Sequence, residues 1–204
     1  MKRQSLCWIG LAMLGCATYA HADSQDTRHW IARIGVHPIS PKPNNHPEFH
    51  VDNSNAVSLG ATYLFTKHWG LELFGTVPAE HDLLDAAGER VGAFDMLPLT
   101  ATIQYHVSDA NGRIRAYAGA GVSYASFGDE RPKGALAASR LQLGSSVGPA
   151  AAVGLDMNMG SRWFVNVDAR WFDIDSELKL NAASRGRLEL DPYAFGLSIG
   201  RRLR

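Results

Sequence analysis

The feature that most constrains the fold of this chain is an alternation of two kinds of side chain at every second residue. Between residues 56 and 66 the apolar set is Val57, Leu59, Ala61, Tyr63 and Phe65, and the residues between them are mostly small or hydroxylated. Successive side chains of a β-strand point to opposite faces, so this alternation predicts a strand with one apolar face. The pattern recurs eight times, over residues 30–39, 56–66, 69–77, 97–107, 114–127, 145–157, 163–174 and 188–203.

The connections between the eight predicted strands alternate in length. Short, turn-like segments follow the second, fourth and sixth strands, at residues 67–68, 108–113 and 158–162. Long polar segments follow the first, third, fifth and seventh, at residues 40–55, 78–96, 128–144 and 175–187. Short turns at one end and long loops at the other are typical of an outer-membrane barrel. A soluble up-and-down barrel of the lipocalin type also has eight strands, so the connections alone leave both open.

Charged residues decide between these two barrels because they fall on one face of the strands. The apolar set collected from the eight strands contains no charged residue. The opposite set holds, among many Gly and Ser, Arg33, Glu72, Gln104, His106, Arg115, Asp156, Asp168 and Arg170. An eight-stranded interior has little room for so many large apolar side chains, whereas a lipid-facing surface requires them. We therefore predict an eight-stranded antiparallel up-and-down transmembrane β-barrel with short periplasmic turns and long extracellular loops.

Aromatic residues of the apolar set are placed near the ends of the predicted strands. Beside the short turns or the chain start stand Trp30, Phe65, Trp69, Tyr105 and Trp163, and near the long loops stand Tyr124, Trp171 and Tyr193. Amphipathic rings settle at the two membrane–water interfaces. The placement predicts two aromatic belts in contact with outer-membrane lipid.

The first 22 residues have the pattern of a secretory signal. Two basic residues precede an apolar stretch over residues 7–20, which ends in the small-x-small motif Ala20-His21-Ala22. We expect cleavage after Ala22, so that residues 23–204 form the barrel domain in the cell outer membrane. Both cysteines lie within the signal, which excludes a disulfide scaffold, a thiol enzyme or a cysteine zinc site in the remaining chain.

Overall charge and hydropathy exclude two further classes. The chain has 20 Lys and Arg against 20 Asp and Glu, so no excess of charge points to nucleic acid as a partner. The mean hydropathy is -0.14, and the longest apolar stretch is shorter than the roughly 20 residues that a spanning helix needs. A helical membrane protein is therefore not expected.

Five segments of the chain resemble the OmpW family of small outer-membrane barrels. They are WIARIGVHPISP (30–41), LGATYLFTKHWGLELFGTVPAEHDL (59–83), RAYAGAGVSYASF (115–127), SRWFVNVDARWFDIDSE (161–177) and DPYAFGLSIG (191–200). The resemblance implies an eight-stranded barrel whose narrow lumen admits small hydrophobic molecules. The family usually ends in an aromatic residue that the barrel-insertion machinery recognises, whereas this chain ends Arg201-Arg202-Leu203-Arg204. Pro98 stands alone where the family tends to have two prolines.

The inward set suggests how the lumen is divided. Six charged residues are expected to pair as a plug in the periplasmic half: Arg33, Glu72, Arg115, Asp156, Asp168 and Arg170. Small residues line the outer half, which predicts an open pocket there, with an apolar wall between the two formed by Leu64, Phe74, Phe164 and Phe172. A hydrophobic ligand stopped by the plug would leave sideways into lipid at Pro149, which cannot donate a ladder hydrogen bond. The alternative is that the small residues permit tight packing in a solid barrel.

Other motifs give weaker signals. His46 and His50 flank a carboxylate, but the prolines around them favour a solvated loop over a metal site. Glu80-His81-Asp82 has an acid beside a base without a placed nucleophile, so no catalytic residue, cofactor or metal is expected. Two rival functions stay open beside passage of hydrophobic molecules. One is a structural or receptor barrel with an inert lumen, and the other is an outer-membrane lipid-modifying enzyme using His37, His81 and Ser123.

Overall fold

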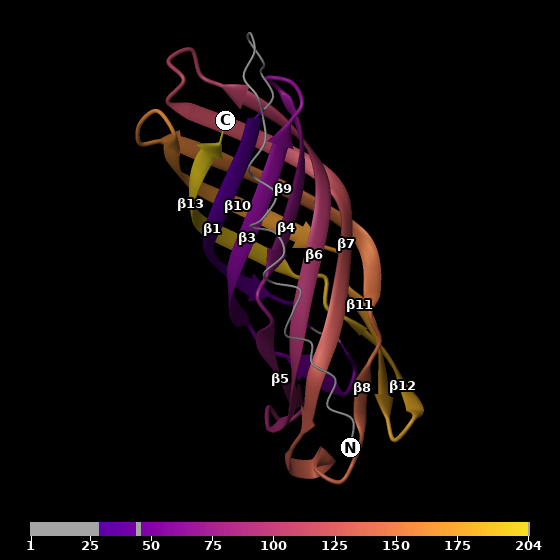
Figure 1. The fold of residues 1–204 in the computed structure, drawn as a ribbon. Coiled ribbons are helices and arrows are strands. Elements are labelled where there is room, and N and C mark those ends of the chain that lie inside the picture. Colours follow the sequence, from indigo (N-terminus) through magenta and orange to yellow (C-terminus); the bar gives the residue numbers. More distant parts are fainter. Residues whose placement is uncertain (1–28, 44–45, 204) are drawn as a thin grey trace.

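The computed structural model describes residues 29–43 and 46–203, and their strands close into an antiparallel barrel (Figure 1). Its eight strands are β1 (His29–Ser40), β3 (Ser54–Leu64), β4 (Trp69–Thr76), β6 (Arg90–Ser108), β7 (Ile114–Pro132), β9 (Ser146–Asn158), β10 (Trp163–Phe172) and β13 (Tyr193–Leu203). Each pairs with its neighbours in chain order, and β13 returns to β1, so the sheet has no open edge along these strands. Closure satisfies the backbone groups internally, which a lipid environment demands. The predicted fold is confirmed.

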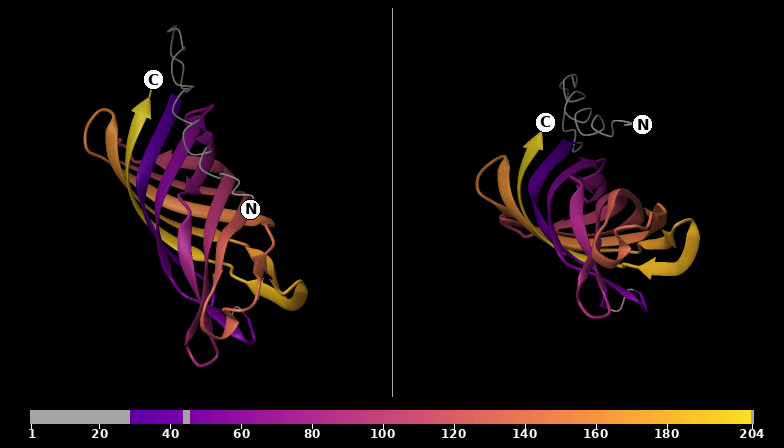
Figure 2. Two further views of the ribbon diagram at one scale, coloured as in Figure 1. Left: turned by 60° about the horizontal axis from the view of Figure 1, so that its bottom comes forward. Right: turned by 90° about the horizontal axis from the view of Figure 1, so that it is seen from below.

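Strand boundaries differ from the prediction mainly at the extracellular end. Segments expected as polar loops contain β2 (Phe49–Val51), β5 (Ala79–Asp85), β8 (Leu141–Leu143), β11 (Asp175–Leu180), β12 (Ala183–Glu189) and a short 3₁₀ turn, η2 (Gly134–Leu136). Strand β5 pairs with the first part of β6, and β8, β11 and β12 form a separate three-stranded sheet. These elements prolong the barrel at the end opposite the short turns and project there as hairpins (Figure 2). The long connections are confirmed, but the strands within them were missed because short paired strands carry too few alternating residues to stand out from polar neighbours.

The predicted last strand, residues 188–203, is in fact two strands. Strand β12 ends at Glu189 and β13 begins at Tyr193. Pro192 lacks a backbone donor, and Asp191 before it has a φ of 33°, outside the extended region. The chain therefore leaves the barrel wall at this point and enters the extracellular sheet.

The orientation of the side chains follows the prediction. Leu73 and Ile103 on the outer face are 45% and 55% exposed, whereas Arg33 and Asp168 on the inner face are 5% and 7% exposed. In a soluble barrel these fractions would be reversed. Among the described residues, no helix is long and apolar enough to cross a membrane.

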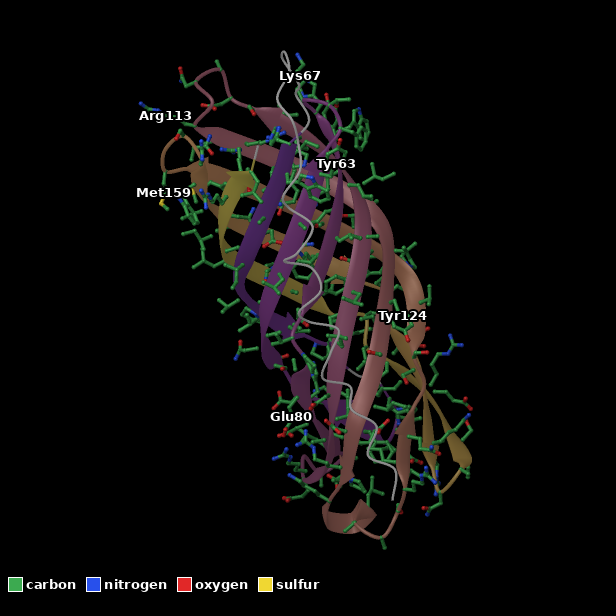
Figure 3. All side chains as sticks on the ribbon, viewed as in Figure 1. Tyr63, Lys67, Glu80, Arg113, Tyr124 and Met159 are labelled. Atoms are coloured by element: carbon green, nitrogen blue, oxygen red, sulfur yellow. The ribbon has the colours of Figure 1, made fainter. Side chains whose placement is uncertain are left out.

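The two ends of the barrel differ in their connections. The short turns, with Lys67, Arg113 and Met159, lie at one end, and Glu80 lies toward the other (Figure 3). Outer-membrane barrels place short turns in the periplasm and long connections outside. This rule assigns the short-turn end to the periplasm. The predicted signal segment lies outside the described residues.

Candidate functional site: the lumen of the barrel

Five buried charged side chains join across the lumen, and we refer to Arg33, Glu72, Asp156, Asp168 and Arg170 as the ion network. Arg170 donates to both oxygens of Glu72 at 2.8 and 3.2 Å, and its Nε donates to Asp168 at 2.5 Å. Arg33 Nη2 lies 3.1 Å from Asp156 Oδ2, and its Nη1 lies 3.5 Å from Glu72 Oε1. The two-pronged pairing of Arg170 with Glu72 is the strongest geometry open to a guanidinium and a carboxylate. A single connected network therefore links strands β1, β4, β9 and β10.

Neutral and aromatic groups complete the ion network. Thr62 accepts from Arg33 at 2.9 Å, Asn166 donates to Asp156 at 2.9 Å, and His37 Nε2 lies 3.1 Å from Asp168. The guanidinium of Arg170 lies over the Phe74 ring at 3.7 Å, and that of Arg33 lies 5.1 Å from the centre of the Tyr117 ring. Buried charges need such partners because an unpaired one loses its hydration without compensation. Tyr117 and Asn166 were not predicted, although their inward positions follow from the same alternation.

Arg115, the sixth residue of the predicted plug, is buried but lies outside the ion network. Its Nη2 donates to the backbone carbonyl of Lys67 at 3.1 Å. Asp168 and Arg170 occupy the outer half of β10, farther from the periplasmic turns than the sequence indicated. Strand tilt in a barrel still brings them level with Glu72 of β4. The structure thus groups five of the six residues.

The four predicted wall residues are all buried, but they form two layers rather than one. Leu64 and Phe164 pack with Ile31 near the periplasmic turns. Phe74 and Phe172 belong to a larger cluster toward the extracellular end. The ion network separates the two layers, since Arg33 lies beside Phe164 and Arg170 beside Phe74.

The larger cluster, which we call the outer apolar cluster, extends from the barrel mouth into the extracellular strands. Its buried members are Ile39, Val51, Ala56, Phe74, Ala79, Leu83, Val91, Phe94, Met96, Ala125, Leu141, Ala150, Phe172, Ile174, Leu178, Leu180, Leu188, Leu190 and Ala194. We expected small residues to leave this half open. Instead, large side chains from the segments predicted as loops pack over them. Sequence reasoning missed these residues because their partners lie on other strands.

Several inward glycines receive a large side chain from a neighbouring strand. A Cβ at Gly154 would meet the Tyr117 ring, and one at Gly200 would meet the Phe164 ring. Aromatic rings that cover strand glycines fill the lumen and fix the register of the strands. The small inward residues therefore serve packing at these positions.

Substitution of Gly154 with alanine tests this packing. The added methyl group would come within about 2.5 Å of the Tyr117 ring, so ring or strand must move. We expect the free energy of unfolding to fall by roughly 1–3 kcal/mol, the usual cost of overpacking. Urea titration in lipid vesicles measures the change. Gly128→Ala is the matched control, because a Cβ at Gly128 meets no atom within 4 Å; equal losses at both positions would contradict the prediction.

The predicted belt residues lie on the outer face. Seven of the eight are 43–55% exposed, from Tyr105 at 43% to Tyr193 at 55%, and Trp171 is half-buried. Trp69 meets Tyr105 edge-on with ring centres 5.0 Å apart, and Trp30 contacts Tyr63 at 5.0 Å. Exposed rings at this density are typical of a membrane interface.

Comparison with known proteins agrees with the geometry of the barrel. The model of the OmpW family matches residues 34–203. The chain belongs to the OmpW family. Outer membrane protein W of Escherichia coli is 34% identical over 76% of each chain, and that of Vibrio cholerae is 28% identical over 97% of this chain and 98% of its own. This OmpW-family barrel is thus a protein of the cell outer membrane.

A solved structure shows the same fold. The outer membrane protein OprG from Pseudomonas aeruginosa superposes with a TM-score of 0.77 at 22% identity, over 89% of this chain and 98% of its own. This likeness supports the eight-stranded architecture of the OmpW-family barrel.

Pro149 of the OmpW-family barrel lies on the outer face of β9, at a weak place in the seam between β9 and β10. Asp173 N donates to the Pro149 carbonyl at 2.9 Å. In an antiparallel pair the opposite residue would return a second bond, which proline cannot donate. Regular pairing of β9 with β10 stops at Ala150 and Phe172, beside this position.

The residues of the enzyme hypothesis have other partners. His37 lies against Asp168, and Ser123 Oγ donates to the carbonyls of Gly148 and Asp173 at 3.2 and 3.4 Å. His81 Nδ1 lies 3.1 Å from the carbonyl of Asp52. The hydrogen-bond partners of His37, His81 and Ser123 are therefore other residues, not one another.

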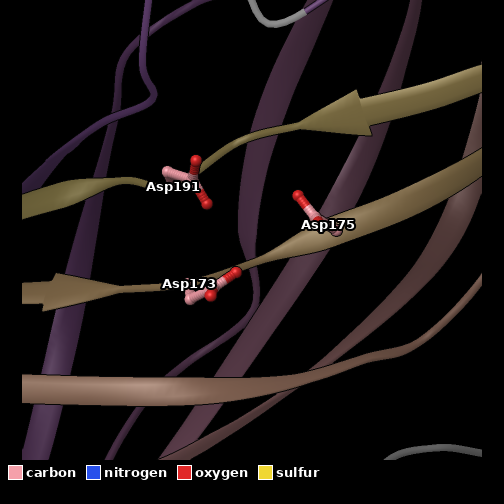
Figure 4. Close-up of side chains that lie close together, drawn as sticks. All are labelled: Asp173, Asp175 and Asp191. Carbon is pink, nitrogen blue, oxygen red and sulfur yellow. The ribbon is translucent and has the colours of Figure 1, made fainter.

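One acidic cluster among the described residues has the spacing of a metal site. Oxygens of Asp173, Asp175 and Asp191 lie within 4.8 Å of one another at the junction of barrel and extracellular sheet (Figure 4). Burial and the charges of the other two carboxylates raise the pKa of Asp175. Arg187 pairs with Asp175 at 2.9 Å and Lys42 lies 3.6 Å from Asp191, so protein cations already offset this charge. His46, where the sequence favoured a solvated loop over a metal site, has its Nε2 3.1 Å from the carbonyl of Arg185.

The burial of His81 predicts that the stability of residues 79–96, at the extracellular end, depends on pH. It is fully buried, stacks on Phe94 at 5.8 Å, and burial lowers its pKa below the ordinary value, against the opposing effect of Asp52, Asp82 and Asp95. The unfolded segment therefore takes up a proton before the folded one, and stability present above about pH 6.5 is lost as the pH falls. We expect faster amide exchange in residues 79–96 at pH 5 than at pH 7.5, corrected for intrinsic rates. His81→Phe should remove the difference, and an unchanged difference would refute the assignment.

Proposed function

We propose that this OmpW-family barrel gives small hydrophobic molecules a route into or across the outer membrane, with entry at the outer apolar cluster and lateral exit into lipid. The observation that carries the proposal is the order of the two layers in the lumen. The outer apolar cluster lies directly against the ion network, since Phe74 belongs to the cluster and contacts Arg170. A ligand that dissolves among the apolar side chains therefore next meets buried, paired charges.

The ion network favours a sideways route over an axial one. Breaking a buried ion pair costs about 3–5 kcal/mol, because each partner is left without water or counter-charge. An apolar ligand offers no hydrogen bond in exchange. Movement from the cluster into the surrounding acyl chains carries no such penalty.

Pro149 supports an exit between β9 and β10. The seam lacks one ladder bond there, and regular pairing of the two strands ends at the neighbouring residues. Opening the wall at this point therefore breaks fewer hydrogen bonds than elsewhere along the pair.

A relative's name supports the class of ligand. The dibenzothiophene metabolism operon protein PahQ of Pseudomonas aeruginosa is 25% identical to this chain over 73% of it. Dibenzothiophene is a small, uncharged aromatic compound. It is therefore a suitable probe for the proposed route.

The experiment compares dibenzothiophene uptake by Gram-negative cells with and without this gene, at matched levels of barrel in the outer membrane. We expect faster uptake with the gene. Equal uptake by both strains would instead favour a structural or receptor barrel whose lumen is inert, the alternative supported by the tight packing of the outer apolar cluster. Passage of large hydrophilic solutes through the purified barrel would also contradict the proposal. Incubation with phospholipid and lipid A tests the remaining enzyme alternative, and we expect no acyl transfer or hydrolysis.

Pro149→Ala tests the lateral exit. Alanine restores a backbone donor that faces the carbonyl of Asp173, which should strengthen the seam by about 0.5–1.5 kcal/mol and slow dibenzothiophene uptake. Pro98→Ala, which removes a proline from the β6–β7 seam instead, is the control and should leave uptake unchanged. Equal uptake by Pro149→Ala and the unsubstituted protein would place the exit elsewhere.

A further inference from the structure

Two arginines at the periplasmic end of the lumen stand apart from the ion network. Arg115 is 7% exposed, and among the described residues neither it nor Arg202 forms an ion pair with a carboxylate. Arg115 donates to the carbonyl of Lys67, and the guanidinium of Arg202 lies over the Phe164 ring at 5.0 Å. The Phe164 ring has Arg202 at 5.0 Å and Arg33 at 5.3 Å, and Asp156, which binds Arg33, stands opposite Arg115, so Arg115 and Arg202 gather at the same end of the lumen.

The nearest carboxylate is already engaged. Asp156 stands opposite Arg115 in the pairing of β7 with β9. Both of its oxygens accept from Arg33, and Oδ1 also accepts from Asn166. Asp156 therefore faces Arg115 and Arg202 while it is paired with Arg33, and its single negative charge does not balance all three guanidinium groups.

Two buried polar atoms in the periplasmic half of the lumen also lack partners. Among the described side chains, Arg115 Nε and Gln104 Nε2 are buried without a hydrogen-bond acceptor, and Gln104 is fully buried. Gln104 lies on β6 opposite Gly119, four residues farther from the periplasmic turn than Arg115, and its Oε1 lies 3.2 Å from His106 Nε2. Unmet buried donors cost free energy unless a ligand or water accepts from them.

We propose that the periplasmic mouth of the lumen binds a small oxyanion, a phosphate or carboxylate group, between Arg115 and Arg202, with Arg115 Nε as one of its donors. Guanidinium groups bind such anions through paired N–H donors, and two of them neutralise a phosphate. Arg202 is only half-buried, so the site is open to the periplasm. Exposed Lys67, Arg113 and Arg162 on the same rim attract anions toward it.

The test uses the full barrel in nanodiscs of phosphatidylcholine, with inorganic phosphate as the probe. We expect calorimetric titration with phosphate, against chloride at equal ionic strength, to show saturable binding. Arg115→Gln and Arg202→Gln should each weaken it about tenfold or more, the effect of losing one charged hydrogen-bonding partner. Arg113→Gln on the exposed rim is the matched control and should change it less than about twofold. Both variants remove like-charge repulsion, so they are expected to fold.

A second arm separates a free anion from a lipid headgroup. If the phosphate belongs to a lipid, native mass spectrometry of the barrel from vesicles of phosphatidylglycerol and phosphatidylcholine should show selective retention of phosphatidylglycerol. Arg115→Gln should lose that retention. Phosphate binding without that retention identifies a free anion as the ligand. Absence of both, or an equal effect of phosphate on Arg115→Gln and the unsubstituted barrel, overturns the proposal and leaves water as the partner of these donors.

Discussion

Replacing Glu72 with glutamine should lower the free energy of unfolding of the barrel by about 3–5 kcal/mol. Glu72 is fully buried, and its two oxygens accept from Arg170 while Oε1 also lies 3.5 Å from Arg33. The neutral amide keeps the shape but leaves both guanidinium groups short of negative charge. Urea titration in phosphatidylcholine vesicles, followed by tryptophan fluorescence, measures the loss.

Glu80→Gln is the matched control for Glu72→Gln. Glu80 also pairs with two arginines, Arg90 and Arg131, but its side chain is 47% exposed. Water and salt screen exposed pairs, so this control should change stability little. Similar losses for the two variants would show that the ion network is no more important than a surface pair. Glu72→Met combined with Arg170→Met should recover part of the loss, because it removes both charges together.

Replacing Leu73 with arginine should destabilise the inserted barrel by about 2–4 kcal/mol. Leu73 is exposed on the outer face of β4, midway between the belt residue Trp69 and the end of the strand near Thr76. At that depth a guanidinium is held among acyl chains far from either aqueous surface. The same vesicle titration measures the effect.

Val107→Arg is the control for position in the membrane. Val107 is 51% exposed on the same outer face but lies at the periplasmic end of β6, beyond Tyr105. A charge near the interface costs only about 0–1 kcal/mol. If Leu73→Arg were as mild as Val107→Arg, the outer face of the barrel at Leu73 would not lie in the hydrocarbon.

Much of the fold was predictable because period-two alternation is a local property of the chain. The inward positions of Arg33, Glu72 and Asp156 follow directly from their neighbours in sequence. The strands of the extracellular extension were missed because segments such as β8, with three residues, are stabilised by pairing with β11 rather than by their own pattern. Most of the outer apolar cluster was missed for the same reason, although Phe74 and Phe172 were predicted to face inward.

The candidate site was predictable in membership but not in connection. Five of the six predicted charges meet, yet Arg115 is left out because Asp156, which stands opposite it, pairs with Arg33 instead. The same holds for Phe74 and Phe164, which are both inward but lie on opposite sides of the ion network.

The alternation within each strand was enough to show that this chain is a membrane barrel and which side chains face its axis, because that alternation and the lipid solvent together admit one orientation. Which charges pair and what fills the outer half became known from the folded barrel. Arg170 and Glu72 are 98 residues apart, and Arg33 and Asp156 are 123 apart. Their meeting depends on the tilt and register fixed when all eight strands close, a property that no single segment carries.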